Sequence, residues 1–167
     1  MVSAWKLYDI PKSVILFLVE DVTYNVCDQK FHEFEIRRQC PDVFIIRRTL
    51  TEIGNRASLT KDKRLMIDGL EIGVVYMRCG YHPDQYPTEL EWDARLMIEL
   101  SLAIKSPSIH YHLAGTKKVQ QQLAVNGVLE KYFDDSKKVD KIRGIFTGLY
   151  SLDATVGLLT YALKVMG

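Results

Sequence analysis

The clearest pattern along the chain is a pair of short apolar runs separated by a helical periodicity. Residues 14–19 are continuously apolar, which is typical of a strand buried on both faces of a sheet. Residues 28–40 follow a helical pattern, and residues 43–46 form the second apolar run. The helical spacing of four and then three is carried by Cys27, Phe31 and Phe34. Strand, helix and strand in this order predict a βαβ unit.

Turn and capping signals organise the middle of the chain. Asp68-Gly69 lies between apolar residues 64–67 and 71–76, which predicts a hairpin because both turn residues tolerate positive φ. Thr88 is followed three residues later by Glu91, the pattern of a capping box. We expect it to begin a helix that continues to about Lys105.

The second half of the chain carries mainly helical signals. Residues 108–113 suggest a short strand, Thr116 is a suitable N-cap for a helix to about Ala124, and residues 134–136 cap another helix. No internal repeat or Pro- or Ser-rich linker interrupts the pattern. The sequence therefore predicts an α/β fold with a helix-rich C-terminal half.

Composition and charge narrow the functional classes. The chain has 167 residues, 47% of them hydrophobic, and its formal net charge is +1, so it lacks the basic field expected of a nucleic-acid-binding protein. Three cysteines without a CxxC pair fit a reducing compartment better than a disulfide framework. No apolar run approaches the ~20 residues that span a bilayer, and the N-terminus has no signal-peptide pattern. We expect a cytoplasmic protein that binds neither nucleic acid nor membrane.

The loop that begins at Arg78 is the first candidate site, because it follows a predicted strand. In open α/β sheets, ligands bind beyond the carboxyl ends of strands. Arg78 offers a planar donor fork for a carboxylate, Gly80 allows close approach to the backbone, and Tyr81 offers a ring with a polar tip. A purely structural loop is the alternative.

Two further segments carry candidate binding residues. Asn25 and Gln29 lie between the first strand and its helix and have no obvious capping task, whereas Asp28 is expected to cap that helix. Lys117 stands at the start of another helix, where a lysine could contact a phosphate. A solvated helix start is the alternative for Lys117, and the P-loop pattern is absent.

Taken together, several segments resemble eukaryotic glutathione synthetase. The resemblance runs in unbroken order from about Val14 to Asp153, and its most specific motif is Leu-Ala-Gly-Thr-Lys-Lys-Val-Gln-Gln at residues 113–121. The other matching segments are residues 25–29, 45–49, 64–65, 68–69, 74–81, 85–86, 92–96 and 148–153. The resemblance implies a Rossmann-like parallel sheet flanked by helices, which agrees with the βαβ pattern.

The resemblance also implies an activity. Members of that family are ATP- and Mg²⁺-dependent ligases that join glycine to γ-glutamylcysteine through an acyl phosphate, and they are homodimers. By position, the residues that would bind γ-glutamylcysteine are Asn25, Gln29, Arg78, Gly80 and Tyr81. Lys117 matches a lysine that contacts ATP, and Thr23-Tyr24 stands where the family has Glu-Arg. No residue of this chain is assigned as catalytic or as a metal ligand.

The resemblance covers one part of a longer enzyme. Residues 1–153 correspond to its substrate-binding domain, and residues 154–167 form a divergent apolar tail that we expect to cover an apolar face or to drive self-association. The magnesium-binding carboxylates and the glycine-rich loop of the family have no counterpart here, so we expect the isolated chain to be inactive. The alternative function is a non-catalytic module that binds a γ-glutamyl peptide or docks on a full-length subunit.

Overall fold

The computed structural model describes residues 1–148 and confirms the α/β class. The chain divides into two compact units, one from Met1 to Ile109 and one that begins at His110. In chain order the elements are α1 Val2–Tyr8, β1 Val14–Leu18, α2 Val26–Gln39, β2 Ile45–Arg48, α3 Leu50–Arg56, β3 Ala57–Leu59, β4 Leu65–Ile67, β5 Leu70–Met77, the 3-10 turn η1 Pro83–Gln85, α4 Glu89–Leu100, β6 Ile104–Ser106, α5 Ile109–Ala114, α6 Lys117–Leu123, the 3-10 turn η2 Leu129–Lys131 and α7 Ser136–Arg143.

The first unit is built on one mixed sheet. Its strand order is β2-β1-β5-β4-β3, with β6 paired to β5 beside β4. β1 pairs in parallel with β2 and β5, and β5 pairs in parallel with β6, whereas β3 and β4 are antiparallel additions. The predicted βαβ unit is β1-α2-β2, and the predicted hairpin joins β4 to β5.

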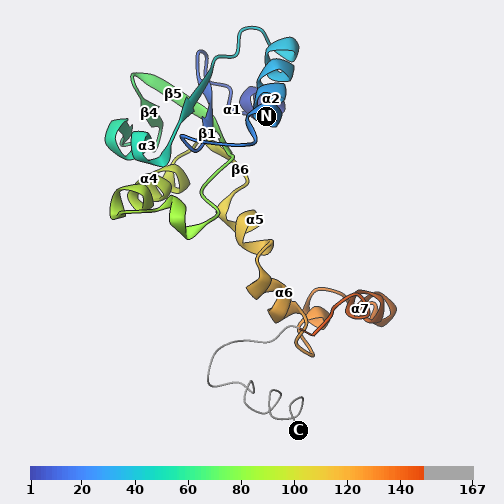
Figure 1. Cartoon of the computed structure of the whole chain (residues 1–167). Coiled ribbons are helices and arrows are strands. Elements are labelled where there is room, and N and C mark those ends of the chain that lie inside the picture. The colour runs from blue at the N-terminus through green and yellow to red at the C-terminus, as the bar shows by residue number, and fades with distance from the viewer. Residues whose placement is uncertain (149–167) are drawn as a thin grey trace. The chain divides into compact units, whose positions relative to one another are not determined.

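Alternate side chains of β1 enter two separate cores. Leu16 and Leu18 point toward α3 and α4, whereas Ile15 and Phe17 point toward α1 and α2. Figure 1 shows these two helix pairs on opposite sides of the sheet. Every side chain of β1 is at most 1% exposed, which is why its sequence is continuously apolar rather than alternating.

Helix α2 turns its polar side toward the sheet. The residues it buries are Gln29, Glu33 and Ile36. Phe31 and Phe34, which set the helical spacing in the sequence, are 68% and 57% exposed, and Cys27 is exposed as well. The helix was therefore predicted from residues that do not pack in its core.

Two element boundaries differ from the predictions. The capping box at Thr88 and Glu91 is present, but α4 ends at Leu100 rather than near Lys105. Residues Ile104–Ser106 instead pair with β5 as β6. The strand predicted at 108–113 is also wrong, because residues Ile109–Ala114 form helix α5.

The second unit is helical over its described residues. Thr116 caps α6 and Asp135 caps α7, as the sequence predicts, and Leu129 and Val139 are its buried apolar side chains. The predicted apolar tail, residues 154–167, lies outside the described residues. Across residues 1–148 no helix is long and apolar enough to cross a bilayer.

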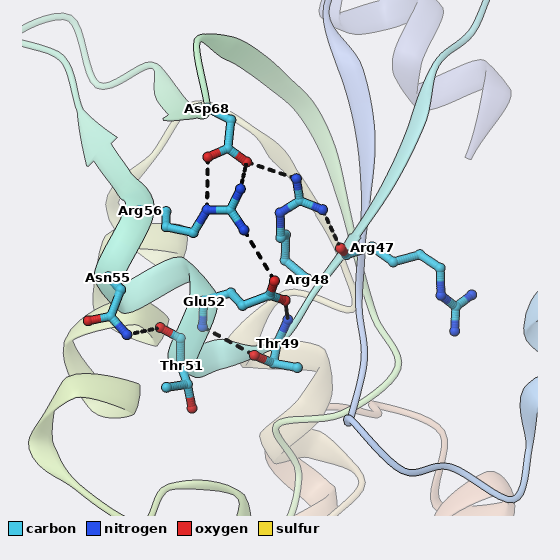
Figure 2. Close-up of polar contacts among 8 residues, drawn as sticks. All are labelled: Arg47, Arg48, Thr49, Thr51, Glu52, Asn55, Arg56 and Asp68. Atoms are coloured by element: carbon cyan, nitrogen blue, oxygen red, sulfur yellow. Dashed lines mark hydrogen bonds and ion pairs between the residues drawn. The ribbon is translucent and has the colours of Figure 1, made fainter.

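An ionic cluster fixes the β4–β5 hairpin to its neighbours. Asp68 and Gly69 form the two-residue turn with φ of 52° and 78°. The Asp68 carboxylate accepts hydrogen bonds from Arg56 Nε at 2.9 Å and Nη2 at 2.8 Å, and from Arg48 Nη2 at 2.8 Å (Figure 2). The bond from Arg48 holds the pKa of Asp68 below its usual value; partial burial opposes this, and Arg56 reinforces it.

We expect Asp68→Asn to lower the thermal midpoint of the chain near neutral pH, because Arg48 and Arg56 lose their shared anion. A carboxyl whose folded-state pKa is depressed stabilises the fold above its unfolded pKa of about 3.9 and stops doing so as pH falls through the folded value. The difference between wild type and variant, followed by circular dichroism, should therefore shrink at acid pH.

Asp62→Asn is the matched control, because Asp62 is exposed and lies in the adjacent loop. An Asp68→Asn difference that stays constant from neutral to acid pH would show that the ion pairs contribute no stability.

Candidate functional site

The loops that carry the predicted binding residues meet at one edge of the sheet. Strands β1, β2 and β5 are parallel and end together. Arg78 N–H donates to the Leu18 carbonyl at 3.0 Å, and Val19 N–H donates to the Arg48 carbonyl at 3.0 Å. This edge is the carboxyl end of the parallel strands, where ligands bind in open α/β sheets.

The loop after β5 is shaped by the side chain of Gln85. The backbone N–H groups of Gly80, Tyr81 and His82 donate to Gln85 Oε1 at 2.7, 3.0 and 3.2 Å. Gln85 Nε2 donates in turn to Glu20 Oε1 at 2.7 Å. One side-chain amide thus joins the loop after β5 to the loop after β1.

The carbonyl side of the same loop is held by Tyr86, which follows η1, and by Arg95 of α4. The Gly80 carbonyl accepts from the Tyr86 hydroxyl at 2.7 Å and from Arg95 Nη1 at 3.2 Å. Gly80 has φ of +90°, and a Cβ there would lie 3.0 Å from the Tyr86 oxygen and 3.3 Å from Arg95 Nη1. A glycine is required here by these two neighbouring side chains as well as by the backbone conformation.

Arg95 is a buried cation in the middle of a helix. Its side chain is 8% exposed and its Nε donates to Glu99 Oε1 at 3.0 Å. Tyr86 is held further by stacking on Trp92, with 4.0 Å between ring centroids. These contacts make the loop after β5 a fixed part of the first unit.

Arg78 projects from this loop to the first turn of α2. Its Nη2 donates to Asp28 Oδ2 at 2.7 Å, and its buried Nε has no hydrogen-bond partner. Burial raises the pKa of Asp28, but the hydrogen bond and charge of Arg78 outweigh it and leave that pKa below its usual value. Asp28 does not cap α2 as predicted, because Asn25 occupies the N-cap position and Asp28 lies in the first turn.

Gln29 is buried and its amide has protein partners at both ends. Gln29 Oε1 accepts from Arg47 Nη2, and Gln29 Nε2 donates to Thr23 Oγ1 at 3.3 Å. Arg47 Nη1 also donates to Glu33 Oε1 at 2.5 Å, and Lys30 Nζ reaches the other oxygen of Glu33 at 2.9 Å. Burial raises the pKa of Glu33, but Lys30 and Arg47 together hold it below its usual value.

Asn25 and Tyr81 are exposed at this edge. An open pocket of about 510 Å³ is bounded by residues 19–23 together with Val26, Arg47, Thr49 and Glu52. None of the predicted binding residues lines this pocket, although Asn25 lies between two of its segments. Cys79 is excluded as a nucleophile at neutral pH, because burial raises the pKa of its thiol to about 12.

Lys117 belongs to the second unit. It is exposed at the start of α6, and its Nζ donates to Gln120 Oε1 at 3.3 Å. Within residues 1–148 no three His, Cys, Asp or Glu side chains are grouped as a metal site would require.

The residues that the sequence did not assign are Gln85, Tyr86, Arg95 and the pair Arg47 and Glu33. Arg95 and the pair Arg47 and Glu33 act between segments distant in the sequence, whereas Gln85 and Tyr86 bind the loop three to six residues before them; hydrophobic periodicity reveals neither kind of contact. Arg47, Gln85, Tyr86 and Arg95 lie in segments that resemble the family, but the resemblance gave them no role.

Comparison with known proteins gives a consistent result. A family model described as eukaryotic glutathione synthase matches residues 13–114. The chain is 46% identical over 151 residues to glutathione synthetase from Xenopus laevis and 43% identical over 152 residues to that from Homo sapiens; each alignment covers 90% of this chain and 31% of the relative. It is 42% identical over 153 residues to the chloroplastic enzyme from Arabidopsis thaliana, covering 92% of this chain and 28% of that protein.

The same fold occurs in a solved structure, a glutathione synthetase-like effector from Globodera pallida in its apo form. That likeness has a TM-score of 0.66 at 24% identity and covers 84% of this chain and 32% of the other. The chain therefore spans about three tenths of the length of the relatives it matches.

We expect Arg47→Ala to lower the free energy of unfolding by ~1–3 kcal/mol, because it removes a charge partner of the buried Glu33 and a donor to Gln29. Urea denaturation measures the loss. Arg37→Ala on α2 is the control, since Arg37 is exposed and makes no ion pair with any other described residue. Equal stability of the two variants would show that the Arg47 network contributes nothing.

Proposed function

The chain belongs to the eukaryotic glutathione synthase family, and on that premise we propose that it is the substrate-binding portion of an ATP-dependent ligase of glutathione biosynthesis. The whole enzyme would join glycine to γ-glutamylcysteine through an acyl phosphate. The observation that carries the proposal is the rigid loop after β5, which presents Arg78 and Tyr81 at the carboxyl edge of the sheet.

Arg78 is the proposed anchor for a carboxylate of γ-glutamylcysteine. A guanidinium has five N–H donors, and Asp28 receives a hydrogen bond from Nη2 alone. Nε is buried, and the donors of Nη1 and Nη2 that Asp28 does not occupy suit a carboxylate, while the Asp28 carboxylate keeps the guanidinium in one orientation. Gly80 contributes the positive-φ backbone conformation of the segment between Arg78 and Tyr81.

Asn25 and Tyr81 are proposed to contact the peptide directly, because both side chains are exposed at this edge. Gln29 is proposed to act from beneath: it holds the Thr23 hydroxyl, which also accepts from Asn25 N–H at 3.3 Å. Gln29 could donate to the peptide only if its hydrogen bond to the Thr23 hydroxyl were broken.

The remaining features of the whole ligase are proposals for this chain. Lys117 is proposed to contact ATP, since it is an exposed cation within the family motif. The described residues alone do not fit Mg²⁺, so the metal belongs in this proposal to the complete enzyme. We further propose a substrate-binding domain over residues 1–153, a separate tail over 154–167, a cytoplasmic location and a homodimer.

For the binding site, we expect Arg78→Ala to weaken γ-glutamylcysteine binding about ten- to a hundredfold, because one charge-assisted contact contributes ~1.5–3 kcal/mol. Arg78→Lys should recover only part, since an ammonium cannot form the planar fork. Titration calorimetry on the full 167-residue chain measures the affinity. Arg64→Ala, a charge-matched change on β4's side of the sheet, should have no effect, and equal affinity of Arg78→Ala and wild type would assign Arg78 to structure.

For activity, we expect the purified 167-residue chain to release no ADP when supplied with ATP, Mg²⁺, γ-glutamylcysteine and glycine. Phosphoryl transfer depends on metal neutralisation of developing charge, and the resemblance assigns one residue of this chain, Lys117, to contact with ATP. A coupled ADP assay measures this. Binding without turnover fits the proposal and also the alternative of a non-catalytic γ-glutamyl-peptide-binding or docking module; Mg²⁺-dependent ADP release above background would contradict both.

A further inference from the structure

We propose that Gln85 is the positioning residue of the substrate loop, and that its amide links this loop to the β1–α2 loop through Glu20. The inference rests on the proposed function for its ligand, γ-glutamylcysteine, although the link itself is independent of any ligand. No role in binding has been assigned to either residue by the family motif.

The loop offers donors that no secondary structure satisfies. Residues 80–82 lie between the end of β5 and η1, so their N–H groups have no strand or helix partner. Gln85 Oε1 accepts from all three N–H groups at 2.7–3.2 Å, the Gly80 contact being partly buried and the other two exposed. Removing this oxygen would leave the N–H groups of Gly80, Tyr81 and His82 without their shared acceptor.

The chemistry of the position selects glutamine. One end of the side chain must accept from backbone N–H groups, and the other must donate to the Glu20 carboxylate at 2.7 Å. The amide of glutamine does both, with its oxygen as acceptor and its NH₂ group as donor. A glutamate could satisfy the loop but would face the Glu20 carboxylate with a second negative charge, and a lysine could satisfy Glu20 but not the loop.

The link matters for binding because each end of it carries proposed ligand groups. Glu20 is followed by residues 21–25, which include the exposed Asn25, and the Gln85-held loop includes Tyr81 next to Gly80. Arg95 and Tyr86 hold the Gly80 carbonyl on the opposite side of the peptide. Gln85 therefore sets how far the two ligand-bearing loops stand apart.

The test reverses the polarity of the link in the full 167-residue chain. Gln85→Glu places two carboxylates together, and such a pair is neutralised by sharing a proton only at lower pH. The double variant Glu20→Gln/Gln85→Glu exchanges the two groups: the amide at position 20 donates to the carboxylate at position 85, which still accepts from the loop. Gln85→Ala removes the link altogether.

Two measurements read the outcome. Without ligand, the amides of Gly80, Tyr81 and His82 should exchange faster in Gln85→Ala than in wild type. In Gln85→Glu the ratio of its exchange rates to those of wild type should be larger at about pH 8 than at about pH 5.5. Affinity for γ-glutamylcysteine should fall about tenfold in Gln85→Glu near pH 8 and return to within about twofold of wild type in the double variant. His82, Asp84, Cys79, Tyr86 and Arg95 also face this loop, so wild type is followed over the same pH range.

A role limited to folding would lower the thermal midpoint of Gln85→Glu but leave the affinity of the folded protein for γ-glutamylcysteine at the wild-type value. The inference is overturned if the three amides exchange at wild-type rates in Gln85→Ala, or if the double variant folds with the wild-type thermal midpoint but fails to regain protection. If no protein, wild type included, binds γ-glutamylcysteine, the proposed function fails while the exchange rates still decide the link.

Discussion

The arrangement of the first unit depends on the complete burial of β1. Both edges of this strand are occupied by parallel neighbours and both faces by helices, so all its side chains are at most 1% exposed. At its carboxyl end the chain reaches solvent at Glu20. Because β2 and β5 run in the same direction beside it, three loops reach solvent at one place, and the site is a consequence of how the central strand is covered.

Side-chain hydrogen bonds, rather than regular secondary structure, give the site its shape. Gln85 satisfies the N–H groups of the loop after β5, and Tyr86 with Arg95 satisfies its carbonyl. Arg78 is in turn oriented by Asp28 from α2. The contacts of Gln85 and Tyr86 are local to the loop, whereas Arg95 and Asp28 reach it from α4 and α2, so the loop geometry combines local hydrogen bonds with the packing of the two helices.

The sequence predicted those features whose cause is local. The apolar run of β1, the Asp68-Gly69 turn and the Thr88 capping box each depend on neighbouring residues, and each is present. The end of α4 was missed because residues 104–106 are recruited by β5, a partner distant in the chain. Family resemblance pointed to Arg78 and Gly80, but only the three-dimensional contacts reveal that Gly80 is confined by Arg95 and Tyr86.

Helix α2 has one further consequence for how the surface can change. An apolar helix face can pack against a sheet at several angles about the helix axis, whereas Gln29 and Glu33 accept Arg47 at one angle only. These directional hydrogen bonds thus fix the rotation of α2 about its axis, and with it the position of the N-cap residue Asn25. The exposed side chains of Phe31 and Phe34 do not contribute to fixing this rotation. Substitution of Phe31 and Phe34 by polar residues would therefore leave the position and direction of the helix N-terminus unchanged.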